Sequence, residues 1–170
     1  EKRGELRPGA TIVEGTAGNT GLGLALVAQA KGYHLVLVIP DKMSREKIST
    51  LKAMGAEVII TRSDVGKGHP EYYQDLAQTI ADDMNTQGQS VYFINQFANP
   101  DNPEAHELTT GPEMWSQMDE ELDAVVIGVG SSGTITGLSR YFAKVAPNVE
   151  LVLADPEGSI LADYIATGVV

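Results

Sequence analysis

Six strand-like apolar runs alternate with helical segments along the chain, and this alternation constrains the fold more than any other feature. The runs lie at 11–14, 34–39, 57–61, 91–94, 123–128 and 150–154. The run His34–Ile39 is almost continuously apolar, which is typical of a parallel strand covered on both faces. Strands separated by helices form crossover units, so the pattern predicts a doubly wound α/β fold with a mostly parallel sheet.

The helical segments have recognisable ends. Gly32 follows the helix expected at 22–31, and Ser44 can cap the helix expected at 45–54. Further helices are expected at 71–87, 103–118, 134–146 and 159–166. We expect a kink or break at Gly111-Pro112, because proline has no N–H to donate within a helix.

Charge and composition exclude several classes of partner. The 170 residues carry a formal net charge of −11. An acidic chain lacks the basic face that nucleic acids and anionic membranes attract, so neither is expected as a partner. The chain has no cysteine, which favours a cytoplasmic protein. Its three histidines are too scattered in the sequence to predict a metal site.

Two glycine-rich turns, Glu14–Gly23 and Gly128–Gly137, each join a predicted strand to a helix. Unpaired N–H groups and the helix dipole make such a turn a site for an anion. Short side chains add further donors, namely Thr16, Asn19 and Thr20 in the first turn and Ser131, Ser132 and Thr134 in the second. The first turn alone could be only a capped turn. Together the two predict a ligand with two anionic groups, or a cofactor phosphate beside a substrate carboxylate.

The second turn has an alternative interpretation. Gly128, Gly130 and Gly133 fit the spacing of a dinucleotide-binding fingerprint, and Asp155 ends the next strand about 20 residues later. A run of hydroxyl groups around the third glycine is unusual for that fingerprint, so we favour a phosphate loop. An NAD-dependent dehydrogenase stays open as an alternative.

Five motifs resemble, in the same order, those of pyridoxal-phosphate enzymes of fold type II, with cysteine synthase and cystathionine β-synthase as nearest members. The motifs are Thr16–Gly21, Gln96–Pro103, Thr109–Glu113, Gly130–Thr134 and Asp155–Ser159. The resemblance covers essentially the whole chain and implies a three-layer αβα fold. It also implies a homodimeric lyase or transferase of cysteine biosynthesis or transsulfuration. That enzyme would use pyridoxal 5'-phosphate to join serine or O-acetylserine to a thiol, either sulfide or homocysteine.

The resemblance also implies a role for each turn. A smaller, mobile subdomain at 12–90 would carry a carboxylate loop, and part of a larger domain at 91–170 would carry a phosphate loop. Asn19 would bind the pyridoxal ring oxygen. The substrate carboxylate would be bound by Thr16, Ala17, Gly18 and Thr20, helped by Gln96. The phosphate loop would consist of Gly130, Ser131, Ser132, Gly133 and Thr134.

The sequence departs from the family at three places. The family usually has Ser where Ala17 stands, and Thr-Gly where Ser131-Ser132 stands. Its Schiff-base lysine precedes the carboxylate loop in a Ser-x-Lys-Asp-Arg-type motif, and no such motif occurs here. We therefore assign no catalytic residue, and expect a central portion of a longer enzyme that is inactive by itself. The missing motif also keeps open a noncatalytic module that binds a phosphorylated ligand or a partner protein.

Overall fold

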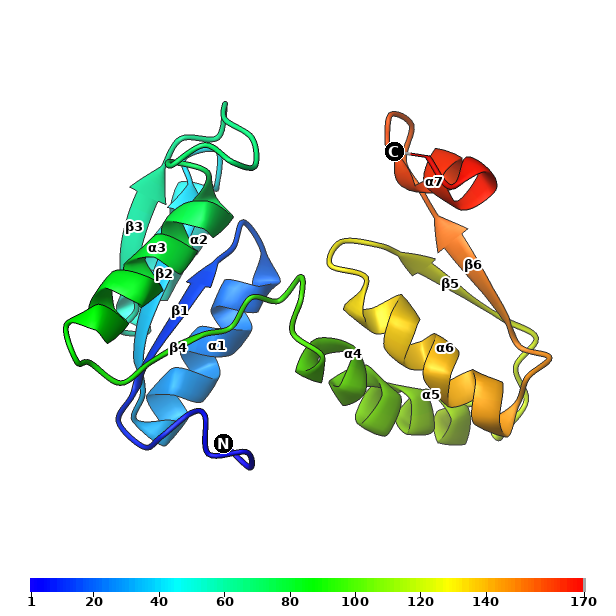
Figure 1. The fold of residues 1–170 in the computed structure, drawn as a ribbon. Helices are drawn as coiled ribbons and strands as arrows, with labels where there is room; N and C mark the ends of the chain where they lie inside the picture. The colour runs from blue at the N-terminus through cyan, green and yellow to red at the C-terminus, as the bar shows by residue number, and fades with distance from the viewer. Residues whose placement is uncertain (170) are drawn as a thin grey trace. The chain divides into compact units, whose positions relative to one another are not determined.

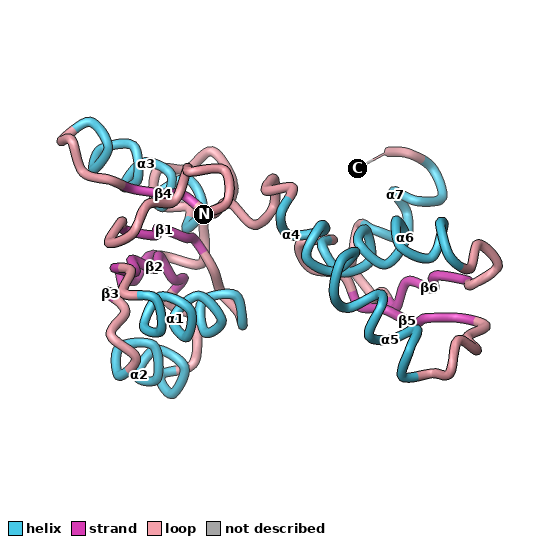
Figure 2. The backbone as a smooth tube through the Cα atoms, turned by 90° about the horizontal axis from the view of Figure 1, so that it is seen from below, coloured by secondary structure: helices cyan, strands magenta, loops and turns pink. Residues whose placement is uncertain are grey.

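The computed structural model describes residues 1–169 and divides into two compact units, one from Glu1 to Asn95 and one that begins at Gln96 (Figure 1). Each unit has its own parallel sheet with helices packed on it (Figure 2). The expected α/β class is confirmed, with the six strands of residues 1–169 divided between two sheets. Over the same residues, no helix is long and apolar enough to cross a membrane.

The first unit is a four-stranded parallel sheet in the order β3-β2-β1-β4. Its strands are β1 (Thr11–Gly15), β2 (His34–Pro40), β3 (Glu57–Thr61) and β4 (Val91–Phe93). The connecting helices are α1 (Asn19–Lys31), α2 (Arg45–Ala53) and α3 (Tyr73–Thr86). Helices α1 and α2 pack on one face of the sheet and α3 packs on the other, so this unit is doubly wound (Figure 2).

Strand β2 accounts for much of the core of this unit. Leu35, Leu37 and Ile39 belong to the cluster beneath α1 and α2. Val36 and Val38 belong to the cluster beneath α3. Successive side chains of a strand point to opposite faces, so a sheet covered on both faces requires an apolar residue at every position. All five residues are buried, which confirms the interpretation of this run.

Strand β4 lies beside β1 and not beyond β3. Thr11–Val13 pairs with Val91–Phe93. The order of strands therefore reverses between β1 and β4, and ligands of open α/β sheets bind at the carboxyl ends of strands at such a switch point. We expected a second domain at 91–170, whereas this pairing keeps Val91–Phe93 in the first unit. Val170 lies outside the described residues.

The second unit contains a parallel pair of strands, β5 (Ala124–Gly128) and β6 (Glu150–Ala154), linked by α6 (Gly133–Val145). A continuous helical run packs against α6 and consists of α4 (Asp101–Ala105), the π-helical η1 (His106–Thr110) and α5 (Gly111–Gln117). The last helix is α7 (Leu161–Thr167). The core of the unit consists of Val125, Ile127, Leu138 and Phe142.

Several helix boundaries differ from the prediction by one to three residues, and two of these differences concern the candidate site or its support. Helix α1 begins at Asn19, three residues earlier than expected. The helix expected at 103–118 begins at Asp101 and continues through Gly111-Pro112 by way of η1. There the Gly111 N–H donates to His106 O, five residues back. The wider π-helical turn keeps the helix continuous up to a proline that cannot donate.

Candidate functional site

The loop expected to bind the substrate carboxylate, Thr16–Thr20, is called the carboxylate loop here. It lies where β1 ends, at the switch point of the first sheet. Thr16 is only 2% exposed, and its N–H donates to Val38 O over 3.0 Å. Its Oγ1 accepts from the Gly18 N–H over 3.2 Å. Thr16 therefore holds the turn in shape from inside, in addition to any contact that its hydroxyl would make with a ligand.

The start of α1 presents backbone donors at this turn. Gly18 is the cap residue and has no side chain with which to cap the helix. Ala17 and Asn19 are exposed, and Thr20 is half-buried. The first N–H groups of a helix have no partner inside it, and the positive end of its dipole lies there. The turn is therefore suited to a carboxylate, and the roles predicted for its residues remain predictions.

The phosphate loop forms a small hollow between β5 and α6. The hollow has a volume of about 60 Å³ and is lined by Gly128–Ile135. Ser132 adopts a left-handed backbone with φ of 66°, which is uncommon for residues other than glycine. It immediately precedes α6, whose positive dipole end lies at the loop. Gly130, Ser131, Ser132, Gly133 and Thr134 thus line one concave surface, as predicted for a bound phosphate.

Asn102 supports the phosphate loop from α4, and the sequence analysis gave it no role. Its Nδ2 donates to Ser131 Oγ over 3.0 Å and to Gln96 O over 2.9 Å. A Cβ at Gly133 would lie 2.1 Å from Asn102 Oδ1, so only glycine leaves room for this amide. Asn102 belongs to the Gln96–Pro103 motif, but its contact with Ser131, 29 residues later, could not be predicted from the sequence.

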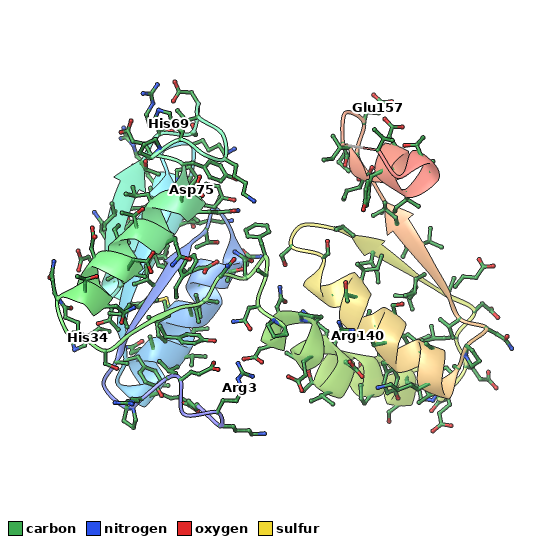
Figure 3. The ribbon with its side chains drawn as sticks, viewed as in Figure 1. Arg3, His34, His69, Asp75, Arg140 and Glu157 are labelled. Atoms are coloured by element: carbon green, nitrogen blue, oxygen red, sulfur yellow. The ribbon has the colours of Figure 1, made fainter. Side chains whose placement is uncertain are left out.

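Gln96 lies with the phosphate loop within the second unit. It lines a cavity of about 320 Å³ together with Ser131, Ser132 and Arg140, among others. Arg140 is exposed on α6 and is labelled in Figure 3. Gln96 was expected to help bind the substrate carboxylate. The structure assigns it to a different unit from the carboxylate loop, and that role stays a prediction.

Neither Thr16–Gly21 nor Gly128–Ile135 contains an ionisable side chain, although the buried Glu14 lies two residues before the first of them. The shifted pKa values lie elsewhere: a hydrogen bond from Arg62 lowers the pKa of Asp64 to about 2, and burial raises that of Tyr72 to about 12. Within residues 1–169, no group of three acidic or histidine side chains could hold a metal ion. Anion binding at either loop would therefore depend on N–H and hydroxyl donors.

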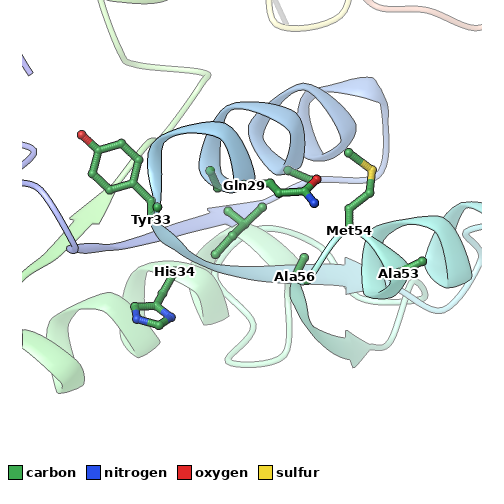
Figure 4. Close-up of a pocket in the computed structure, with 11 residues that line it drawn as sticks. Gln29, Tyr33, His34, Ala53, Met54 and Ala56 are labelled. Atoms are coloured by element: carbon green, nitrogen blue, oxygen red, sulfur yellow. The ribbon is translucent and has the colours of Figure 1, made fainter.

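A further cavity of about 370 Å³ lies near the amino end of strand β2, away from the carboxyl ends where the carboxylate loop lies (Figure 4). It is lined by His34 at the amino end of β2, by Gln29 on α1 and by small residues such as Ala53 and Ala56. Ligands of parallel α/β sheets bind at the carboxyl ends of the strands. This cavity is therefore not assigned to the candidate site.

Comparison with known proteins gives a family and several relatives. Residues 1–169 match the family described as "Pyridoxal-phosphate dependent enzyme". The chain is 42% identical over 161 residues to cystathionine beta-synthase of Apis mellifera, covering 95% of this chain and 31% of that protein. It is 43% identical over 164 residues to cysteine synthase 3 of Caenorhabditis elegans, covering 95% and 47%. The chain thus spans about a third to a half of the length of these relatives.

A solved structure supports the same relationship. The crystal structure of O-ureido-L-serine synthase aligns with a TM-score of 0.81 at 34% sequence identity. The alignment covers 95% of this chain and 49% of the other. At this coverage the likeness extends over both compact units.

Proposed function

The chain belongs to the family of pyridoxal-phosphate dependent enzymes, and from that premise we propose that it supplies the two anion-binding loops of a β-replacement enzyme. The enzyme would be of the cystathionine β-synthase or cysteine synthase type, which joins serine or O-acetylserine to a thiol. The observation that carries the proposal is the hollow lined by Gly128–Ile135 at the start of α6. The family match favours this function over a nicotinamide-dependent dehydrogenase.

The phosphate loop would hold the cofactor. When bound, pyridoxal phosphate supplies an electron sink for the substrate carbon, and the protein supplies binding and orientation. The backbone N–H groups and hydroxyls around Ser131, Ser132 and Thr134 would bind the phosphate. Because these donors include the backbone, replacing the family's Thr-Gly by Ser131-Ser132 would leave binding intact.

The carboxylate loop would hold the amino-acid substrate. The N–H groups at the start of α1 would bind the α-carboxylate, with Thr20 adding a hydroxyl. Asn19 is exposed at the turn and would donate its amide to the ring oxygen of the cofactor. At Ala17 the hydroxyl usual in the family is missing, so the backbone would carry more of the binding there.

We further propose that the whole protein is a cytoplasmic homodimer that serves transsulfuration or cysteine biosynthesis. The absence of cysteine from the sequence supports the cytoplasmic location. The homodimer and the pathway follow from the family resemblance. Neither a nucleic acid nor a membrane is proposed as a partner, since the net charge of −11 disfavours both.

The test uses the complete protein that carries this sequence. It should be yellow from lysine-bound cofactor, borohydride should remove that colour, and serine or O-acetylserine should react with homocysteine or sulfide. A colourless protein that binds no pyridoxal phosphate would contradict the proposal. Tight NADH binding with enhanced fluorescence would support the dehydrogenase. Cofactor binding without turnover of any such pair would point to a noncatalytic module.

A further inference from the structure

One imidazole connects the phosphate loop to the helical run behind it. His106 is half-buried and is the first residue of η1. Its Nε2 lies 3.2 Å from Thr134 Oγ1, and its Nδ1 lies 2.9 Å from Thr110 Oγ1. Thr134 also lines the hollow of the phosphate loop. The His106 ring is therefore hydrogen-bonded to a residue that is expected to contact the phosphate.

The packing of η1 on α6 fixes the position of this ring. A Cβ at Gly137 would lie 2.6 Å from His106 Cβ and 2.3 Å from Pro103 O. The absence of a side chain at Gly137 thus allows the two helical segments to approach closely. Single π-helical turns within α-helices are frequent at functional sites, and η1 is such a turn.

A count of hydrogens leaves two possible arrangements of these bonds. A threonine hydroxyl has one hydrogen, and a neutral imidazole has one N–H. If Nε2 carries that hydrogen, it donates to Thr134 Oγ1, while the Thr110 hydroxyl donates to Nδ1. The Thr134 hydrogen is then available to an anion in the hollow. In the other tautomer, Thr134 donates to the ring and cannot donate to the anion.

We propose that His106 is a positioning residue that, as the Nε2–H tautomer, turns the Thr134 hydroxyl toward the cofactor phosphate. The inference rests on the proposed function, because it takes Gly130–Thr134 as the phosphate loop. His106 acts through Thr134 and makes no contact with the phosphate itself.

The first test measures affinity for pyridoxal 5'-phosphate in the complete protein. Thr134→Val removes one hydrogen bond to a charged group and should weaken binding about tenfold or more. His106→Leu should weaken binding about threefold to tenfold, because the hydroxyl of Thr134 is no longer held in place. His106→Gln keeps a donor and an acceptor and should restore most of the affinity. The double variant His106→Leu/Thr134→Val should bind no more weakly than Thr134→Val alone.

Two controls separate positioning from a general loss of structure. Pyridoxal, which lacks the phosphate, should bind the wild type and the His106 variants equally well. Glu107→Gln removes the ion pair between Glu107 on η1 and Lys144 on α6, and Lys144 lies ten residues beyond Thr134 along that helix. This variant should retain wild-type affinity for pyridoxal 5'-phosphate, although it perturbs the same pair of helical segments.

A second test needs no variant at His106. In protein labelled with ¹⁵N-histidine, the spectrum reports the tautomer of each ring, with His34 and His69 as references. Inorganic phosphate should shift the His106 resonances and leave those of His34 and His69 in place.

The possible outcomes separate the two proposals. A complete protein that binds neither pyridoxal 5'-phosphate nor phosphate would overturn the proposed function, and this inference with it. Phosphate binding together with the Nδ1–H tautomer at His106 would overturn this inference alone. This inference alone would also be overturned if His106→Leu bound pyridoxal 5'-phosphate as tightly as the wild type does. It would likewise be overturned if His106→Leu bound pyridoxal more weakly than the wild type does.

Discussion

The contact between Gly133 and Asn102 gives the sharpest prediction about the phosphate loop. In Gly133→Ala, the new Cβ would lie 2.1 Å from Asn102 Oδ1 and 2.5 Å from its Cγ, so the amide must move. That movement breaks the bonds from Asn102 to Ser131 Oγ and Gln96 O. Each such bond contributes about 0.5–1.5 kcal/mol. The loss of both, about 1–3 kcal/mol, is offset in part by the helix preference of alanine over glycine, about 1 kcal/mol.

The assay is urea unfolding, followed by cofactor binding. The net loss is then up to about 2 kcal/mol, and its middle value of about 1 kcal/mol would lower the urea midpoint by roughly 0.5 M at an m-value of about 2 kcal/mol per M. Gly130→Ala is the matched control, since no heavy atom lies within 4 Å of its added Cβ. Asn102→Ala in the Gly133→Ala background removes the colliding group, so the two losses should be less than additive. Equal midpoints for Gly130→Ala and Gly133→Ala would refute the reasoning.

Four further substitutions test other parts of the fold. Leu51→Ala, at a fully buried residue of α2, should lower the free energy of unfolding by about 2–5 kcal/mol. Leu26→Ala, at a residue that is 62% exposed, should change it by less than about 0.5 kcal/mol in the same chemical-denaturation assay. Ser44→Ala removes the side-chain acceptor at the start of α2 and should cost about 1 kcal/mol, seen as a lower thermal midpoint. For Asp64, NMR titration should give a pKa of about 2, and Arg62→Gln should return it toward the ordinary value of 3.8. Since the pKa of Asp64 is depressed in the folded protein, the stabilisation by this pair is present above about pH 4 and is lost as the pH falls toward 2. An unchanged Asp64 titration in Arg62→Gln would contradict the assignment of the lowered pKa to Arg62.

The sequence was sufficient where a local pattern determines the structure. Strand β2 could be predicted because every residue of a doubly covered strand must be apolar, and 34–39 satisfies this condition. Both glycine-rich turns could be placed because each directly follows a strand and opens a helix. The family match and the aligned solved structure confirm the resemblance to fold type II pyridoxal-phosphate enzymes.

Features that depend on distant contacts could not be predicted. The pairing of β4 with β1 joins residues about 80 positions apart, and no periodicity encodes it. Asn102 lay just before the helix expected at 103–118, and His106 was only one of three scattered histidines. Their roles became visible only when α4 and η1 were seen against α6, because a hydrogen bond depends on the three-dimensional path of both segments.

The lack of ionisable side chains in Thr16–Gly21 and Gly130–Thr134 has a consequence for how such sites change over evolution. When the donors are mainly peptide N–H groups, the ligand is specified by the path of the main chain. The side chain at a position such as Ser132 is then free to vary, provided that the turn is preserved. A substitution that alters the backbone, such as proline for Ser132, would be far more damaging than one that alters only a hydroxyl. Relatives that bind the same anion can therefore differ at such a position, and a search by residue identity alone would overlook them.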